Sequence, residues 1–293
     1  MKKNHRHLFF LLLILQLSSC SSTTPSTYKI EYQRGPATFQ SCLMTMNNII
    51  SYKVHTGAAS VAHKTAKSLD ELEASYGGES LIDIQRFLSN EEIKTNNLNL
   101  KKLLAADFEL TAIPDKKNFV TRAEADVIYK AMQDSRVHKN HDCYDTKGTI
   151  GFCFGRATIA HMEAIVRNVH PEAIRKIWIA GDMEKWGHHV ATMVKSENGW
   201  LVLDTNVGRA ITTDEWIAMY MPFKAKGADE IMVFVTQAGR FGPYNTSSYN
   251  ALDLFNTNGL NFNKAQDYYR GYFHDYFEDL DNVSNSPPQF IKP

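Results

Sequence analysis

The sequence predicts an α+β protein in which a buried helix packs on an antiparallel sheet. Between residues 154 and 169, apolar side chains recur every three or four positions beside a stripe of alanines, which is typical of a helix buried on two sides. Short apolar runs follow at 177–181, 189–194, 200–207 and 231–236, and the "SENG" between the second and third runs predicts a hairpin. A buried helix followed by hairpin-linked strands favours the α+β class.

The chain before this helix is expected to be mostly helical. The spacing of apolar residues predicts helices over residues 59–76 and 80–108. The "IPDKKN" at 113–118 interrupts that pattern, because proline followed by Asp and further charges breaks a helix. We therefore expect an N-terminal helical region at 28–112 and a second domain at 113–293.

Two further helices are expected in the second domain. One is predicted over residues 122–135, and an aromatic stripe over 265–280 predicts another that docks on the core. His170-Pro171 is expected to end the buried helix, since the residue before a proline avoids the helical conformation.

The composition is that of an ordinary globular protein. The chain has 293 residues, of which 43% are hydrophobic and 22% charged, enough for one large domain or two smaller ones. Its 32 Lys and Arg balance 32 Asp and Glu, and no long basic face stands out. Nucleic acid is therefore not an expected partner.

The first residues have the pattern of an export signal and a tether. A basic start precedes an apolar run, Leu8–Leu17, that is too short to span a bilayer. The run ends in "LSSC", which resembles a bacterial lipobox with Cys20 as the lipidated residue, so residues 1–20 are the expected signal peptide and 21–27 a polar tether. We expect a lipid anchor to the cell envelope, and Ser21 favours the outer membrane where the cell has one. The alternative is an ordinary cleaved signal peptide and a secreted protein.

The four cysteines leave two arrangements open. Beyond Cys20 they are Cys42, Cys143 and Cys153, and export favours disulfides. A Cys42–Cys143 disulfide would join the N-terminal region to the later domain and leave Cys153 with a free thiol. A Cys143–Cys153 disulfide would instead abolish any thiol chemistry, and counting alone does not decide between the two.

Cys153 stands where the buried helix is expected to begin, within "GFCFGRATIAHM". Backbone N–H groups at a helix N-terminus favour negative charge, so they lower the pKa of a thiol and are able to hold an oxyanion. A nucleophilic thiol also needs a histidine that accepts and returns a proton, and a third group that orients this histidine. A lone cysteine is more often structural, so Cys153 is a candidate nucleophile only if such partners lie close to it.

The candidate partners lie on the predicted hairpin. His189 and Asp204 would share one face of the two strands, which favours His189 over its neighbour His188. If residues 198–199 formed the turn, Asp204 would lie four residues along from His189, roughly 13 Å away at about 3.4 Å per residue. For the two side chains to meet, we therefore expect a longer loop with Gly199 in the left-handed conformation.

Residues 113–222 resemble the bacterial protein-glutaminase family. The similar pieces occur in one order: "AIPD", "GFCFGRATIAHM", "IWIAGDM", "WGHHVATMV" and "LDTNVGRAITTDEW". The resemblance implies a papain-like, transglutaminase-like fold, with the family's nucleophile at Cys153, its histidine at His189 and its aspartate at Asp204. Known members are typically secreted with a pro-region, so residues 28–112 are either a removable pro-region or a permanent domain.

The activity implied by the resemblance is hydrolytic deamidation of glutamine side chains in proteins. Proteins with accessible glutamines are then the expected substrates, and neither a metal nor an organic cofactor is expected. Trp186 and His188 flank the site in sequence and are expected at its rim, unless they are plain loop residues. The same triad would serve a transglutaminase or a cysteine peptidase, and a non-catalytic lipoprotein that binds an envelope partner is the alternative of a different class.

Overall fold

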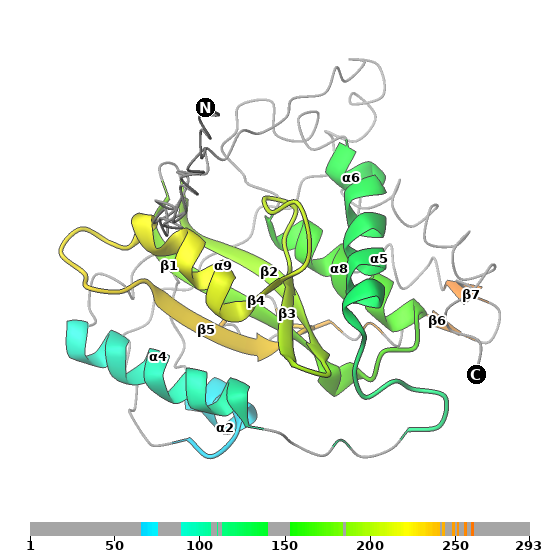
Figure 1. The fold of residues 1–293 in the computed structure, drawn as a ribbon, viewed down its shortest axis with the longest axis horizontal. Helices are drawn as coiled ribbons and strands as arrows, with labels where there is room; N and C mark the ends of the chain where they lie inside the picture. Colours follow the sequence, from blue (N-terminus) through cyan, green and yellow to red (C-terminus); the bar gives the residue numbers. More distant parts are fainter. Residues whose placement is uncertain are drawn as a thin grey trace, which may run out of the picture. The chain divides into compact units, whose positions relative to one another are not determined.

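The protein forms helices and a five-stranded antiparallel sheet with strand order β4-β3-β2-β1-β5 (Figure 1). Residues 1–31 make up a unit separate from 32–293, and every described residue belongs to the latter. The computed structural model describes residues 66–75, 89–106, 110, 113–139, 153–183, 186–240, 242–243, 248–249, 251, 255–256 and 259–260.

The described elements confirm the predicted α+β class. The helices are α2 (Leu69–Ser75), α4 (Asn90–Ala105), α5 (Arg122–Asp134), α6 (Arg136–Lys139), α8 (Cys153–Val166) and α9 (Thr213–Tyr220), with 3-10 turns at Pro171–Ala173 and Met221–Phe223. The strands of the sheet are β1 (Ile174–Met183), β2 (Trp186–Ser196), β3 (Gly199–Leu203), β4 (Ile211–Thr212) and β5 (Met232–Gln237), and β6 (Phe255–Asn256) pairs with β7 (Gly259–Leu260).

Consecutive strands pair as predicted. β1 pairs with β2 and β2 with β3, both antiparallel, and β5 returns to the free edge of β1. β1 and β2 are longer than their apolar runs suggested, because polar residues such as Arg175 and Lys176 also continue the ladder. β4 and α9 were not predicted. They follow β3 after the loop that begins at Asp204.

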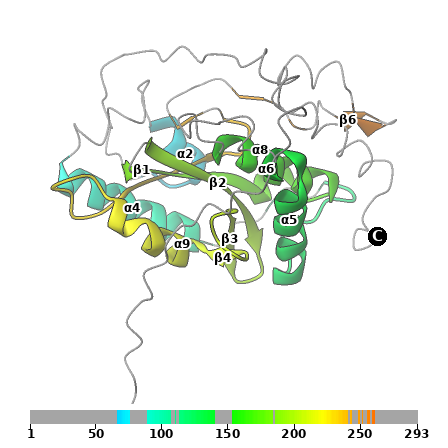
Figure 2. The ribbon, with the colours of Figure 1, turned by 90° about the horizontal axis from the view of Figure 1, so that it is seen from above.

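Helices cover both faces of the sheet. Thr192 of β2 donates a hydrogen bond from Oγ1 to the Ala157 carbonyl of α8, so the even-numbered positions of β2 face α8. His189 therefore points to the opposite face, where its ring packs on Trp216 of α9. Figure 2 shows α8 on one side of the sheet and α4 and α9 on the other.

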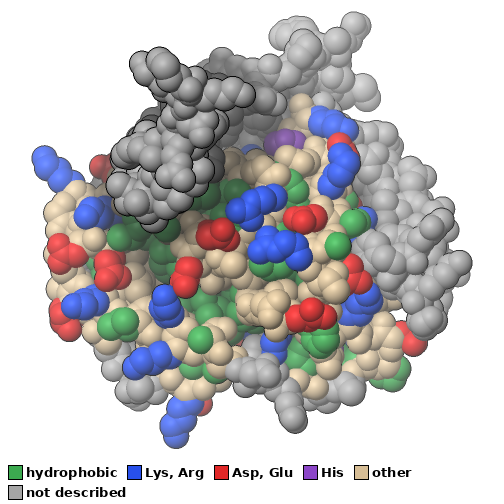
Figure 3. Space-filling view, viewed as in Figure 1, with side chains coloured by type: hydrophobic (Ala, Val, Ile, Leu, Met, Phe, Trp, Pro, Cys, Tyr) green, Lys and Arg blue, Asp and Glu red, His purple; other side chains and the backbone are tan. Residues whose placement is uncertain are grey.

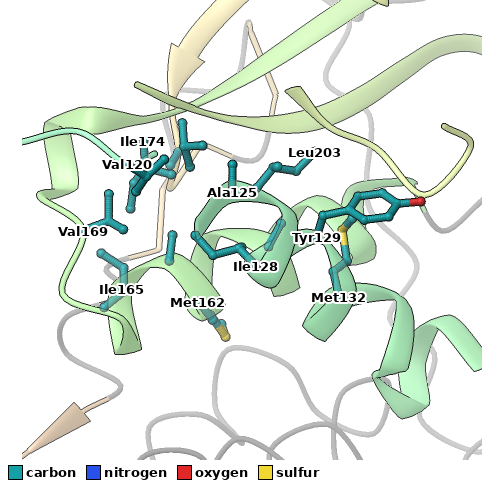
Figure 4. Close-up of a cluster of buried hydrophobic side chains, with 14 of the residues drawn as sticks. Val120, Ala125, Ile128, Tyr129, Met132, Met162, Ile165, Val169, Ile174 and Leu203 are labelled. Atoms are coloured by element: carbon teal, nitrogen blue, oxygen red, sulfur yellow. The ribbon is translucent and has the colours of Figure 1, made fainter. Parts of the chain in front are cut away.

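The core lies between α5, α8 and the sheet (Figure 4). Ile128 and Met132 of α5 pack with Met162 and Ile165 of α8, and Ile174 begins the sheet side of the same cluster. Every residue of α8 from 155 to 165 is buried, which confirms the prediction of a helix enclosed on both sides. This enclosure fixes the position of the α8 N-terminus.

The α8 helix ends earlier than expected. It stops at Val166 rather than at His170, because Asn168 adopts the left-handed conformation with φ of 59°. The Val169 N–H then bonds the Ala164 carbonyl and the Asn168 N–H bonds the Ile165 carbonyl, which is the Schellman pattern of helix closure. His170-Pro171 instead begins the short 3-10 turn that leads into β1.

The two described helices of the predicted region 28–112 pack on β5. α4 begins at a complete capping box of Ser89 and Glu92, and α2 and α4 lie inside the helices predicted over 59–76 and 80–108. Ile93 and Leu100 of α4 are almost fully buried. These helices are thus part of the same core structure as the sheet.

The surface carries charges of both signs. On the face shown in Figure 3, Lys and Arg side chains are interspersed with Asp and Glu. Within the part of the chain that the structure describes, no helix has the length and apolar character needed to cross a membrane. The expected signal peptide and tether at 1–27 and the aromatic segment 265–280 lie outside the described residues.

Candidate active site

Cys153 is the first residue of α8, and its half-buried thiol is free. Backbone N–H groups in the first turn of a helix have no partners within the helix, and the helix dipole places partial positive charge there. The buried body of α8 surrounds this charge with little water, which strengthens its effect on the sulfur. The structure thus places the predicted cysteine at a helix N-terminus.

Two groups of strand β2 act on the Cys153 sulfur. The backbone N–H of Val190 and the side chain of His189 both favour the thiolate and so lower the pKa of Cys153. β3 pairs with β2 only between Thr192 and Ser196, so among the described strands none pairs with β2 on that side before Thr192. An unpaired strand edge of this kind offers its N–H groups to a side chain.

His189 also contacts Asp204. Its Nε2 lies 2.8 Å from Asp204 Oδ2, and both side chains are buried. Because Nε2 faces the carboxylate, Nδ1 is the ring nitrogen left for the sulfur of Cys153. The structure therefore brings together the three residues that the sequence analysis selected, in the order thiol, imidazole, carboxylate.

The hairpin reaches this geometry by a different turn from the one expected. Ser196 pairs with Gly199, so the loop is the two residues 197–198 and is not longer, as we had expected. Gly199 does have the expected positive φ, of 105°. Moving the turn by one residue shifts the pairing by two, so Asp204 continues β3 opposite Ala191 and is a diagonal neighbour of His189. Diagonal positions lie about 7–8 Å apart, within reach of long and aromatic side chains.

Helix α9 adds two aromatic residues that the sequence analysis missed. Trp216 Nε1 donates to Asp204 Oδ2 at 2.8 Å, and the Tyr220 hydroxyl donates to the same oxygen at 2.9 Å. Both rings also pack on His189, with centroids 5.9 Å and 5.0 Å away. The "TTDE" capping box that starts α9 was the available signal, because it predicts a helix with positions 216 and 220 on one face.

Charge and hydrogen bonding favour an ionised Cys–His pair. Burial acts to raise the pKa of the Cys153 thiol, but His189, with a smaller contribution from Arg156, holds it below its ordinary value. Burial acts to lower the pKa of His189, but the charge and hydrogen bond of Asp204 raise it to about 9. Burial opposes the charge of Asp204 as well, yet the His189 charge holds its pKa well below the ordinary value. The lowered pKa of Cys153 and the raised pKa of His189 both favour a thiolate paired with an imidazolium.

His188 differs from His189 in each respect. His188 pairs with Ala180 of β1 and directly precedes His189 on β2. Its side chain therefore points to the face of the sheet opposite to that of His189. Burial, together with the charge of His189, lowers the pKa of His188 to about 4, so this ring is neutral near pH 7. Its Nδ1 is buried without a hydrogen-bond partner. The side chain of Trp186 lies outside the described residues, so its place at a rim stays a prediction.

The other predicted residues lie outside the described part of the chain. Cys20, Cys42 and Cys143 are all among them, so lipidation and the Cys42–Cys143 disulfide stay predictions. Among the described residues, no group of three or more His, Cys, Asp or Glu side chains is arranged to hold a metal ion.

Comparison with solved structures returns protein-glutaminases. A crystal structure of a mutant of pro-protein-glutaminase has a TM-score of 0.36 and 13% identity, and the match covers 57% of this chain and 64% of that one. A crystal structure of protein-glutaminase has a TM-score of 0.31 and 12% identity over 45% and 83% of the two chains. The NMR structure of protein-glutaminase from Chryseobacterium proteolyticum has a TM-score of 0.31 and 15% identity over 59% and 96%. No protein-family model and no curated protein matches the chain.

Proposed function

We propose that the protein is a cysteine amidohydrolase that deamidates glutamine side chains in proteins. The observation that carries the proposal is the position of His189, which acts on the Cys153 thiol and lowers its pKa on one side, and lies 2.8 Å from Asp204 Oδ2 on the other. This is the arrangement that activates a thiol for acyl transfer. The choice of glutamine rests on the sequence resemblance over residues 113–222.

In the proposed reaction the Cys153 thiolate attacks the side-chain carboxamide carbon of a glutamine. The tetrahedral oxyanion is stabilised by the backbone N–H of Cys153 and by the helix dipole at the α8 N-terminus. The His189 imidazolium gives its proton to the leaving nitrogen, which departs as ammonia and leaves a thioester on Cys153. Asp204 stabilises the charged form of His189.

Hydrolysis completes the cycle. Neutral His189 takes a proton from a water molecule as the oxygen attacks the thioester carbon, and the carbon–sulfur bond breaks to give glutamate and the thiolate. The net change is one water consumed and one ammonia released for each glutamine converted. The chemistry uses side chains of the chain itself.

The test measures ammonia release and the intact mass of a glutamine-rich protein treated with the chain expressed from Ser21 onward. We expect ammonia together with a mass gain of about one dalton per event. Cys153→Ala should lower the rate by on the order of 10⁴-fold or more, because the nucleophile is absent. Cys153→Ser is the matched variant, since it keeps a hydrogen-bonding side chain but replaces the thiolate with a weak nucleophile.

Other products would overturn the proposal in distinct ways. Isopeptide bonds to an added amine would identify a transglutaminase, and shortened chains would identify a peptidase. No product at all, together with a Cys153 thiol that is alkylated no faster than a free cysteine, would identify a non-catalytic protein.

A further inference from the structure

The carboxylate of Asp204 accepts hydrogen bonds from three groups besides His189. Three donors converge on Oδ2: His189 Nε2 at 2.8 Å, Trp216 Nε1 at 2.8 Å and the Tyr220 hydroxyl at 2.9 Å. Oδ1 accepts the backbone N–H of Asn206 at 3.0 Å. We propose that Trp216 and Tyr220 are positioning residues, which fix Asp204 against His189 and so keep the Cys153–His189 pair ready for catalysis. The inference rests on the proposed function for its role in turnover, but its geometry is independent of the substrate.

Asp204 needs such support because of where it lies. Strand pairing stops at Leu203, so no backbone ladder fixes the residue that follows. His189 is only a diagonal neighbour, and the carboxylate must reach along the sheet to meet it. Asn206 fixes one oxygen from the turn, and Trp216 and Tyr220 fix the other from α9.

The two aromatic residues are themselves firmly held. They are four positions apart on α9, so both project from the same face of the helix. Trp216 is completely buried and Tyr220 nearly so. The Asn206 side-chain amide donates to the Tyr220 oxygen at 3.0 Å, which leaves the hydroxyl proton free to point at Asp204. The complete capping box of Thr212 and Glu215 fixes the start of the same helix.

The same rings also separate the His189–Asp204 pair from water. The Trp216 ring lies nearly parallel to His189, with an interplanar angle of 26°, and the Tyr220 ring is tilted by 33°. A dry, preorganised ion pair is stronger than one that water can enter. The titratable side chains that interact with the His189–Asp204 pair from the surrounding elements are Cys153, His188, Tyr129 and Tyr220. Arg156 acts on Cys153 and Tyr220.

The test uses variants that keep an aromatic ring at each position and remove the donor, and Trp216→Phe also replaces the indole with a smaller ring. In Trp216→Phe and Tyr220→Phe we expect the pKa of His189, followed by NMR on histidine-labelled protein, to fall from about 9 toward its ordinary 6.5. The cause is loss of the carboxylate from Nε2. We expect kcat to fall roughly 10- to 100-fold for each variant with KM unchanged, the range for losing a hydrogen bond to a charged group. The signal is assigned with His189→Gln.

Tyr129→Phe is the matched control. Tyr129 is also buried and donates its hydroxyl to a backbone carbonyl, that of Val207, but it makes no hydrogen bond to Asp204. This variant should be less stable and yet keep the pKa of His189 at about 9. If Trp216→Phe and Tyr220→Phe behave in the same way, with lower stability and an unchanged or higher His189 pKa, they are core residues only and the inference is overturned.

The rate of Cys153 alkylation by iodoacetamide, measured against pH, separates this inference from the proposed function. The rate reports the thiolate and requires no substrate. A loss of thiolate at neutral pH in the two variants supports the inference, even if the wild-type protein proves to act on something other than glutamine.

Discussion

At the scale of single residues, the shifted pKa values predict how activity depends on pH. In the proposed reaction His189 must be protonated to release ammonia, so kcat/KM should fall as the pH rises through about 9. On the acid side, activity should be lost only below the lowered pKa of Cys153, where the thiolate is protonated. In Asp204→Asn the carboxylate charge is gone, so we expect the alkaline limb to move to lower pH. A limb that stays at about 9 in this variant would show that His189 is not the group that titrates.

The same residues show what the sequence could predict about the site. Cys153, His189 and Asp204 could be selected because thiol, imidazole and carboxylate have distinct chemical roles and the strand alternation favoured His189 over His188. Trp216 and Tyr220 could not, because aromatic residues are most often core residues, and their role arises only when α9 folds back over Asp204.

At the scale of elements, α4 closes the exposed edge of β5. β5 pairs only with β1, so its other edge would leave backbone groups unpaired. Asn97 of α4 replaces a strand there: its Nδ2 donates to the Ile231 carbonyl at 2.8 Å and its Oδ1 accepts the Val233 N–H at 3.2 Å. The neighbouring Asn96 donates to the Val233 carbonyl at 2.8 Å.

This arrangement predicts that Asn97→Ala lowers the free energy of unfolding by about 1–3 kcal/mol, because two edge groups lose their partner. Urea unfolding should show a lower midpoint with an unchanged slope. Asn99→Ala is the control, since Asn99 lies on the same helix and its side chain makes no hydrogen bond to another described residue. If both variants change stability equally, the effect comes from helix propensity and not from the strand edge.

Elements with a strong pattern could be predicted, and short ones could not. The α8 helix and β1, β2, β3 and β5 were visible from their apolar spacing. β4 has two residues and α9 eight, too few for a periodic pattern to stand out. A loop longer than two residues was expected, because a turn at 198–199 would keep His189 and Asp204 apart. The structure instead has a two-residue turn at 197–198, which puts Gly199 after the turn with positive φ.

At the scale of the whole molecule, the question is whether the helices before residue 113 are removable. α2 and α4 contribute buried apolar side chains, namely Leu69, Leu72, Ile93, Leu100 and Leu104. Burial of five such residues is worth on the order of 10 kcal/mol, similar to the whole stability of a typical domain. Ion pairs join α2 to β1 and to the turn after β5, through Asp70 with Arg175 and Glu73 with Arg240. These contacts favour a permanent part of the fold over a pro-region that leaves.

Cleavage of the chain after α4 tests whether the N-terminal helices stay bound to the rest of the fold. With a specific protease site introduced between Ala106 and Ile113, cleavage under reducing conditions, which exclude any Cys42–Cys143 link, should leave both fragments in one particle by size-exclusion chromatography. The rate of Cys153 alkylation should not change. Leu100→Ala should release the N-terminal fragment or weaken its retention, since it removes a buried side chain at about 2–5 kcal/mol. Leu98→Ala, at a position 52% exposed on the same helix, should not. Spontaneous release of the fragment, with faster alkylation or faster ammonia production afterwards, would instead identify this region as a pro-segment that restrains the site.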